Sequence, residues 1–142
     1  MTEESRTKCK GRLDWVRSDA GFCDLKTCRD ITAFAFGAAF YRYSYDISLG
    51  LYHRWLSRLR GQTEPCWVLC VENEEPYDVA VVPVPQAVLD QGVEKSLRII
   101  ERYEKCAETG VWPGVANGAE YWMHVPHWAM DEDAELNWNN DE

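Results

Sequence analysis

Apolar residues alternate between short runs and helical spacing along this chain, and their order predicts an α/β domain. Runs at 12–16 and 22–27 flank the turn-forming stretch 17–21, which predicts a β-hairpin. From residue 32 to residue 60 the chain loses its turn residues and becomes rich in Ala, Phe, Tyr and Leu at helical spacing. A helix-start signal at 44–46 divides this stretch, so we expect two consecutive helices.

The next segment predicts a second pair of strands. The run 66–71 is continuously apolar and indicates a buried strand. Residues 72–76 have turn composition, and 77–82 indicates a further strand. Pro83 and Pro85 are expected to end the sheet, because proline cannot donate to a strand ladder.

A long helix follows, with apolar positions at helical spacing from Leu89 to Ala107. Gly110 and then Pro113 form a typical helix end. The predicted order is therefore β-β-α-α-β-β-α, which indicates an α/β fold with a central mixed sheet flanked by helices. We expect residues 1–130 to form one domain.

Charge is distributed unevenly over the 142 residues, whose net charge is −9. Residues 131–142 hold six acids and no base, and we interpret them as a disordered acidic tail. The overall charge argues against nucleic-acid binding through a generally basic surface. Basic residues nevertheless gather at 8–29 and 54–60, which is compatible with a local DNA-facing patch. With no secretory signal at 1–6 and no apolar run of membrane length, we expect a cytoplasmic protein without membrane partners.

Six cysteines raise the question of a metal centre or disulfides. They form no C-x-x-C pair and have no histidine at zinc-finger spacing. An iron–sulfur cluster has no spacing in its favour. The simpler interpretation is reduced thiols, several of which fill core positions.

The first hairpin carries the candidate chemistry. With a five-residue loop, Val16 faces Phe22, and counting back places Asp14 opposite Asp24. Lys26 lies two residues beyond Asp24 and projects from the same face. The opposite face then holds four residues that we expect to pack on the core: Leu13, Trp15, Cys23 and Leu25.

Two aspartates opposite each other on paired strands have Cβ atoms about 4.5–5.5 Å apart, and like charges so placed are destabilising. A divalent cation between Asp14 and Asp24 would relieve the repulsion, since Mg²⁺ is commonly held by one or two carboxylates with water and phosphate oxygens. Lys26 could then orient water or neutralise a scissile phosphate, which suits metal-assisted phosphodiester hydrolysis. The alternative is an ordinary charged hairpin face, with Lys26 pairing with Asp24 in solvent.

Several segments, in order, resemble one nuclease family. Gly11-Arg-Leu-Asp14 with Asp24-Leu-Lys26-Thr27 resembles the PD-(D/E)xK signature. Residues 40–52 resemble a helix that carries a Tyr-x-x-Gln-x-x-x-Tyr motif, and 68–80 resembles the strand pair that follows it. The later stretches Glu104–Gly114 and Pro126–Ala129 resemble the closing segment. Together, from residue 11 to residue 130, they resemble the nuclease domain of exodeoxyribonuclease VIII (RecE-like) proteins.

This resemblance implies a restriction-endonuclease-like core and assigns roles to individual residues. Asp14 and Asp24 would be metal ligands for Mg²⁺ or Mn²⁺, and Lys26 would be the catalytic lysine. Supporting or DNA-facing roles would fall to three residues of the helical motif: Tyr45, Ser48 and Tyr52. The neighbouring Glu72 could approach the metal, although a turn-flanking acid is the simpler interpretation.

The resemblance also implies partners. Such nucleases degrade linear double-stranded DNA from an end, often as ring-shaped homo-oligomers that act alongside a single-strand annealing protein. Two departures bear on activity. Ser48 replaces the motif glutamine and has a shorter reach. Only ten residues precede Gly11, so we expect the N-terminal helical section of the family, with its further acidic metal ligand, to be missing.

Three hypotheses follow from these observations. The chain is a metal-dependent DNA exonuclease completed by a partner chain or by a second copy. Alternatively, it is an inactive fragment or remnant that binds metal or DNA ends without cutting. In the third, it is an interaction module that keeps the nuclease scaffold for another purpose.

Overall fold

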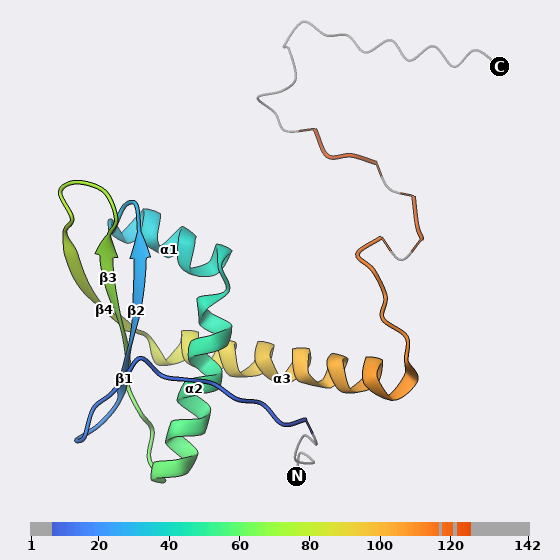
Figure 1. Cartoon of the computed structure of the whole chain (residues 1–142), viewed down its shortest axis with the longest axis horizontal. Coiled ribbons are helices and arrows are strands. Elements are labelled where there is room, and N and C mark those ends of the chain that lie inside the picture. Colours follow the sequence, from blue (N-terminus) through green and yellow to red (C-terminus); the bar gives the residue numbers. More distant parts are fainter. Residues whose placement is uncertain (1–6, 117, 121, 126–142) are drawn as a thin grey trace, which may run out of the picture. The chain divides into compact units, whose positions relative to one another are not determined.

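The computed structural model describes residues 7–116, 118–120 and 122–125 (Figure 1). The elements follow the predicted order β-β-α-α-β-β-α, and their bounds are β1 (Trp15–Val16), β2 (Phe22–Cys28), α1 (Ala33–Arg42), α2 (Tyr45–Arg60), β3 (Cys66–Glu72), β4 (Val79–Val84) and α3 (Gln86–Thr109).

The chain divides into two units, Met1–Gly110 and Val111–Glu142, and every one of these elements belongs to the first. No helix of the described chain is long and apolar enough to cross a membrane. The predicted acidic tail at 131–142 lies outside the described residues.

The four strands form one mixed sheet in the order β1-β2-β3-β4. The hairpin strands pair antiparallel with Trp15 opposite Cys23 and Val16 opposite Phe22, which confirms the predicted register. β2 and β3 are parallel, because α1 and α2 carry the chain back between them, and β4 returns antiparallel to β3.

β1 is shorter than the predicted strand at 12–16. The backbone N–H of Leu25 donates to the Asp14 carboxylate (2.9 Å). In a longer strand pair this N–H would instead donate to a backbone carbonyl of β1. The structure thereby limits β1 to Trp15–Val16. Its loop closes with a hydrogen bond from the Arg17 N–H to the Gly21 carbonyl (3.1 Å).

The helices lie on one side of the sheet (Figure 1), and we call this covered side the inner face. Its central residues are buried at 2% exposure or less: Phe22, Cys66, Val68 and Cys70. The opposite side is the outer face, where Trp15 is 64% and Leu25 is 50% exposed. Of the four residues predicted to pack on the core from this side, Leu13 does so, whereas the prediction was wrong for the exposed Trp15 and Leu25. Both sides of β2 carry apolar residues, and the position of the helices decides which side is buried.

Proline does not end the sheet where expected. Pro83 lies within β4, opposite Trp67 of β3. β4 is an edge strand, and proline is tolerated there because one side of the strand lacks a pairing partner. β4 ends at Val84, two residues beyond the predicted strand, and Pro85 then separates it from the first residue of α3, as expected of that proline.

α2 and α3 cross in close backbone contact at two glycines. A Cβ built on Gly50 would lie 2.5 Å from the carbonyl carbon of Gly92, and a Cβ on Gly92 would overlap the carbonyl oxygen of Asp46. The crossing also brings Lys95 of α3 to Asp46 of α2, whose carboxylate is 2% exposed and accepts from the ammonium at 2.5 Å. The ion pair and the glycines together fix the start of α2 against α3.

Glu64, which the sequence did not single out, ties the hairpin to the segment before β3. Its carboxylate is fully buried and accepts from the Gly21 backbone N–H, from the Gln62 amide (2.8 Å) and from Arg60 (3.3 Å). The hydrogen bond from Gly21 is the largest cause of a lowered pKa for this carboxyl. The backbone carbonyl of Glu64 also contacts Nδ1 of the buried His53 (2.7 Å).

Candidate active site

Asp24 and Lys26 project from the inner face of β2, beneath the helices. Asp24 is 5% exposed, and its carboxylate accepts a hydrogen bond from the Lys26 ammonium. On the adjacent β3, Val68 is the register partner of Asp24 and Cys70 is that of Lys26. The pair therefore lies in the middle of the sheet, beside two residues of β3 that are themselves fully buried.

Burial separates this pair from an ordinary surface ion pair. The Lys26 side chain is 20% exposed and the Asp24 side chain 7%. The alternative of a hairpin face paired in solvent is therefore wrong. Burying a carboxylate and an ammonium is costly unless they remain paired, so such a pair is weak evidence for a purely stabilising role.

Asp14 precedes β1 and extends the hairpin register toward Asp24. Its carboxylate is exposed and is held by the Leu25 N–H. Burial, followed by the negative charges of Asp24 and Asp14, raises the pKa of the Cys23 thiol.

These two aspartates fit a hard divalent cation in donor chemistry. Mg²⁺ prefers oxygen ligands and is often held by one or two carboxylates, with water and phosphate oxygens completing the shell. In the described part of the chain no group of three or more His, Cys, Asp or Glu side chains gathers around a possible metal position. Asp14 and Asp24 would therefore supply the protein ligands, two carboxylates that lie within the one or two by which Mg²⁺ is usually held.

The three residues of the helical motif have separate surroundings. The Tyr45 ring lies against Lys26, whose Nζ is 4.7 Å from the ring centroid. The Ser48 hydroxyl donates to the Tyr45 carbonyl (3.1 Å) within its own helix. Tyr52, two turns further along α2, packs against Gly11 of the N-terminal segment and against Trp55. The structure thus brings Tyr45 to the Asp24–Lys26 pair and uses Tyr52 for packing.

Glu72 lies at the end of β3 and serves the adjoining loops. Its carboxylate accepts from the backbone N–H groups of Ile31 and Asp78, each at 3.3 Å. These contacts agree with the simpler interpretation of a turn-flanking acid.

Several arginines of the predicted DNA-facing patch already have acidic partners. Arg17 pairs with Asp19 (2.6 Å), and Arg29 contacts Glu74 (3.1 Å). Arg60 donates to Glu64 and to a backbone carbonyl. These contacts reduce the positive charge available for phosphate groups.

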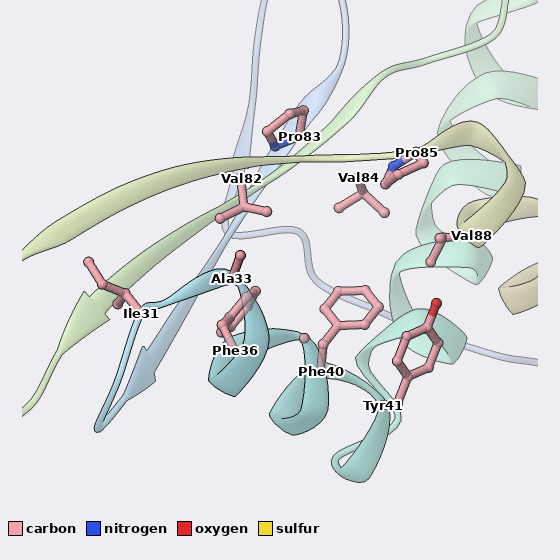
Figure 2. A pocket seen from close by; sticks show the side chains of 11 residues that line it. Ile31, Ala33, Phe36, Phe40, Tyr41, Val82, Pro83, Val84, Pro85 and Val88 are labelled. Atoms are coloured by element: carbon pink, nitrogen blue, oxygen red, sulfur yellow. The ribbon is translucent and has the colours of Figure 1, made fainter.

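An apolar pocket of about 290 Å³ lies between α1, β4 and the start of α3 (Figure 2). Phe36 and Phe40 form its helical wall, and Val82 and Val84 form the strand side. The Tyr41 hydroxyl is the polar side-chain group at its rim in the close-up. The pocket has no carboxylate or basic side chain in its lining, and neither Asp24 nor Lys26 is among its lining residues.

Three of the six cysteines serve as packing residues. All six are free thiols, and Cys66, Cys70 and Cys106 are buried. Burial, and after it the nearby Asp24 charge, raise the pKa of Cys66 to about 12. Burial also raises the pKa of Cys70 to about 12. These thiols are neutral at physiological pH, as predicted for core cysteines.

A family model described as "PDDEXK-like domain of unknown function (DUF3799)" matches residues 1–125. The chain belongs to this PDDEXK-like family. The description names a PDDEXK-like domain, and the matched residues include the D…D-x-K arrangement of Asp14, Asp24 and Lys26. The match assigns no role to any residue.

A solved structure from Eubacterium rectale, named "Putative exonuclease", has the same fold as this PDDEXK-like chain. The TM-score is 0.56 at 17% identity, over 82% of this chain and 48% of the other. The chain thus spans about half the length of that protein. No curated protein matches the sequence.

Proposed function

We propose that this PDDEXK-like chain is a metal-dependent nuclease domain that hydrolyses phosphodiester bonds of linear double-stranded DNA, as the RecE-like resemblance implies. The observation that supports this most strongly is the buried Asp24–Lys26 pair on a central strand, with Asp14 directly before β1 and hydrogen-bonded to the Leu25 N–H. A fold keeps such a pair at a desolvation cost that apolar residues would avoid, and this pair coincides with the Asp24 and Lys26 positions of the D…D-x-K motif.

In this proposal Asp14 and Asp24 hold Mg²⁺ or Mn²⁺, which when bound neutralises charge on the scissile phosphate. Lys26 donates from its ammonium to the phosphate or to the attacking water, next to the carboxylate it already contacts. The 20% exposure of its side chain leaves the ammonium an approach from solvent.

The test is digestion of end-labelled linear duplex DNA with Mg²⁺ or Mn²⁺, against a closed-circular substrate. Lys26→Met is expected to lower the rate at least about 100-fold, the loss typical of a group that stabilises transition-state charge. Lys95→Met is a matched control, because Lys95 also pairs with a buried aspartate but lies between α2 and α3. It should keep the activity if the protein stays folded. Equal activity of Lys26→Met and wild type would contradict the proposal.

A second candidate function is a domain that binds metal without cutting DNA. It is supported by the small number of ligands, because only two carboxylates, Asp14 and Asp24, are proposed to hold the metal. Calorimetric titration with Mn²⁺ distinguishes the two. Binding that is lost in Asp24→Asn, together with no digestion of either DNA, supports the second candidate. Stable oligomers and a single-strand annealing partner remain proposals from the resemblance, to be tested by sedimentation and by co-purification.

A further inference from the structure

The Lys26 ammonium has an aromatic surface on one side as well as a carboxylate on another. Its Nζ donates to Asp24 and lies 4.7 Å from the centroid of the Tyr45 ring. A cation within about 6 Å of an aromatic centroid is attracted to the ring face, more strongly where water is excluded. The lysine side chain is only 20% exposed, so this contact is largely desolvated.

The orientation of the Tyr45 ring is itself fixed by its neighbours. Ser44, between α1 and α2, has a left-handed backbone (φ 56°), and this turn places Tyr45 at the first position of α2. Phe40 meets the Tyr45 ring edge-to-face, with centroids 6.1 Å apart and planes at 87°. Tyr43 packs beside it at 5.7 Å. The ring is therefore packed against two aromatic neighbours.

We propose that Tyr45 is a positioning residue for Lys26, an inference that rests on the proposed nuclease function for its catalytic consequence. Lysine has four rotatable side-chain bonds and loses considerable conformational freedom when its ammonium is held in one place. The Tyr45 ring face and the Asp24 carboxylate hold it from two sides. Tyr45 acts through the face of its ring, so phenylalanine should replace it and an aliphatic residue should not.

The same protein contains a comparable arrangement outside the candidate site. Lys95 pairs with Asp46 and lies 5.5 Å from the centroid of the Tyr41 ring. Tyr41→Leu therefore removes a tyrosine from an aspartate–lysine–tyrosine group without touching Asp24 or Lys26. It controls for the general loss of an aromatic residue.

The first measurement is nuclear magnetic resonance of the Lys26 side chain, assigned with Lys26→Met. Protons above a ring face are shifted upfield, so the Lys26 Cε protons should show this shift and cross-relaxation to the Tyr45 ring protons in the wild type. Tyr45→Phe and Tyr41→Leu should keep the shift, and Tyr45→Leu should lose it. Absence of both signals in the folded wild type would overturn the proposal, even if Tyr45→Leu fails to fold.

The second measurement is the rate of DNA digestion by the same variants. Tyr45→Leu is expected to lower kcat about 10-fold with KM changed less than about 2-fold, whereas Tyr45→Phe stays near wild type. Equal losses in the Phe and Leu variants would assign the effect to the hydroxyl and overturn the positioning role. An inactive wild type that keeps the upfield shift would contradict the proposed nuclease function alone, because the resonance measurement needs no activity.

Discussion

The two faces of the sheet differ in a way that hydrophobicity does not explain. On β2 the inner face holds Phe22 at 0% and Asp24 at 5% exposure, whereas Leu25 on the outer face is 50% exposed. On β4 the outer residue Val81 is 64% exposed. A carboxylate is thus buried while apolar side chains one position along the strand (Leu25) or two strands away (Val81) remain in contact with solvent. The position of the helices, and the pairing of Asp24 with Lys26, therefore determine which side chains of the sheet are buried.

The largest difference between the faces should appear when a core ring is removed. Phe22→Ala is expected to lower the free energy of unfolding by about 3–5 kcal/mol, because Phe22 is fully buried and its loss leaves a cavity. Leu25→Ala, three residues along the same strand, should cost less than about 1 kcal/mol, since half of its surface is already exposed. Urea denaturation measures both. Similar costs for the two variants would mean that the outer face is covered in solution.

A smaller effect should come from breaking the inner-face ion pair. Lys26→Met leaves the Asp24 carboxylate buried without its partner, and we expect a loss of about 1–3 kcal/mol, below the full cost of a buried pair because the lysine is partly exposed. Adding Asp24→Asn should recover most of this loss, since the unpaired charge is then removed. Purely additive costs in this double-mutant cycle would show that the two side chains do not interact.

The contact between the hairpin and the segment before β3 should depend on acidity. The Gly21 N–H lowers the pKa of Glu64 below its usual value of 4.5, so the folded state favours the charged carboxylate. Its contribution to stability is therefore present above that value and is lost as the pH falls through the lower, folded pKa. Thermal unfolding between pH 7 and pH 3 should show this loss, and Glu64→Gln should flatten it. An unchanged pH profile in that variant would exclude Glu64 as the source.

The smallest effect concerns the thiols and leaves stability unchanged. Cys66 and Cys70 on the inner face have pKa values raised to about 12 by burial, so little thiolate is present at pH 8. Cys9 is exposed and should react with an aromatic disulfide reagent at an ordinary rate. Labelling followed by mass spectrometry should find the two inner thiols modified only after denaturant is added. Rapid labelling of Cys70 in buffer would indicate that the inner face opens.

Much of the fold could be predicted from local sequence. The order of elements, the division of the helices near Ser44 and the pairing of Trp15 with Cys23 all depend on residues close together in the chain. The buried face of the hairpin could not be predicted, because both faces of β2 carry apolar residues and the helices that decide between them are distant. Pro83 was misread for a related reason: only the edge position of β4 makes a proline acceptable inside it.

Parts of the site were also beyond local reasoning. Asp14, Asp24 and Lys26 were identified from strand alternation, and the structure places Asp24 and Lys26 in contact. The burial of that pair depends on Tyr45 and the helices above it, which the spacing does not reveal. The sequence did not single out Glu64, because one donor to its carboxylate is Gly21, which lies 43 residues away in the chain. An acid directly before the Pro65 and Cys66 strand start was the only local signal.

The glycine crossing of α2 and α3 has a consequence for how this sequence can change over time. At Gly50 and Gly92 the helices meet through backbone atoms, so any side chain there must push them apart. Elsewhere along the two helices, neighbouring side chains can exchange volume and compensate one another. In a library of all single substitutions sorted for folded protein, almost no substitution should therefore be recovered at Gly50 or Gly92. Nearby exposed positions such as Arg58 and Glu94 should accept most residues. The crossing holds the first turn of α2, which begins at Tyr45. The position of Tyr45 therefore depends on Gly50 and Gly92, two residues without functional side chains.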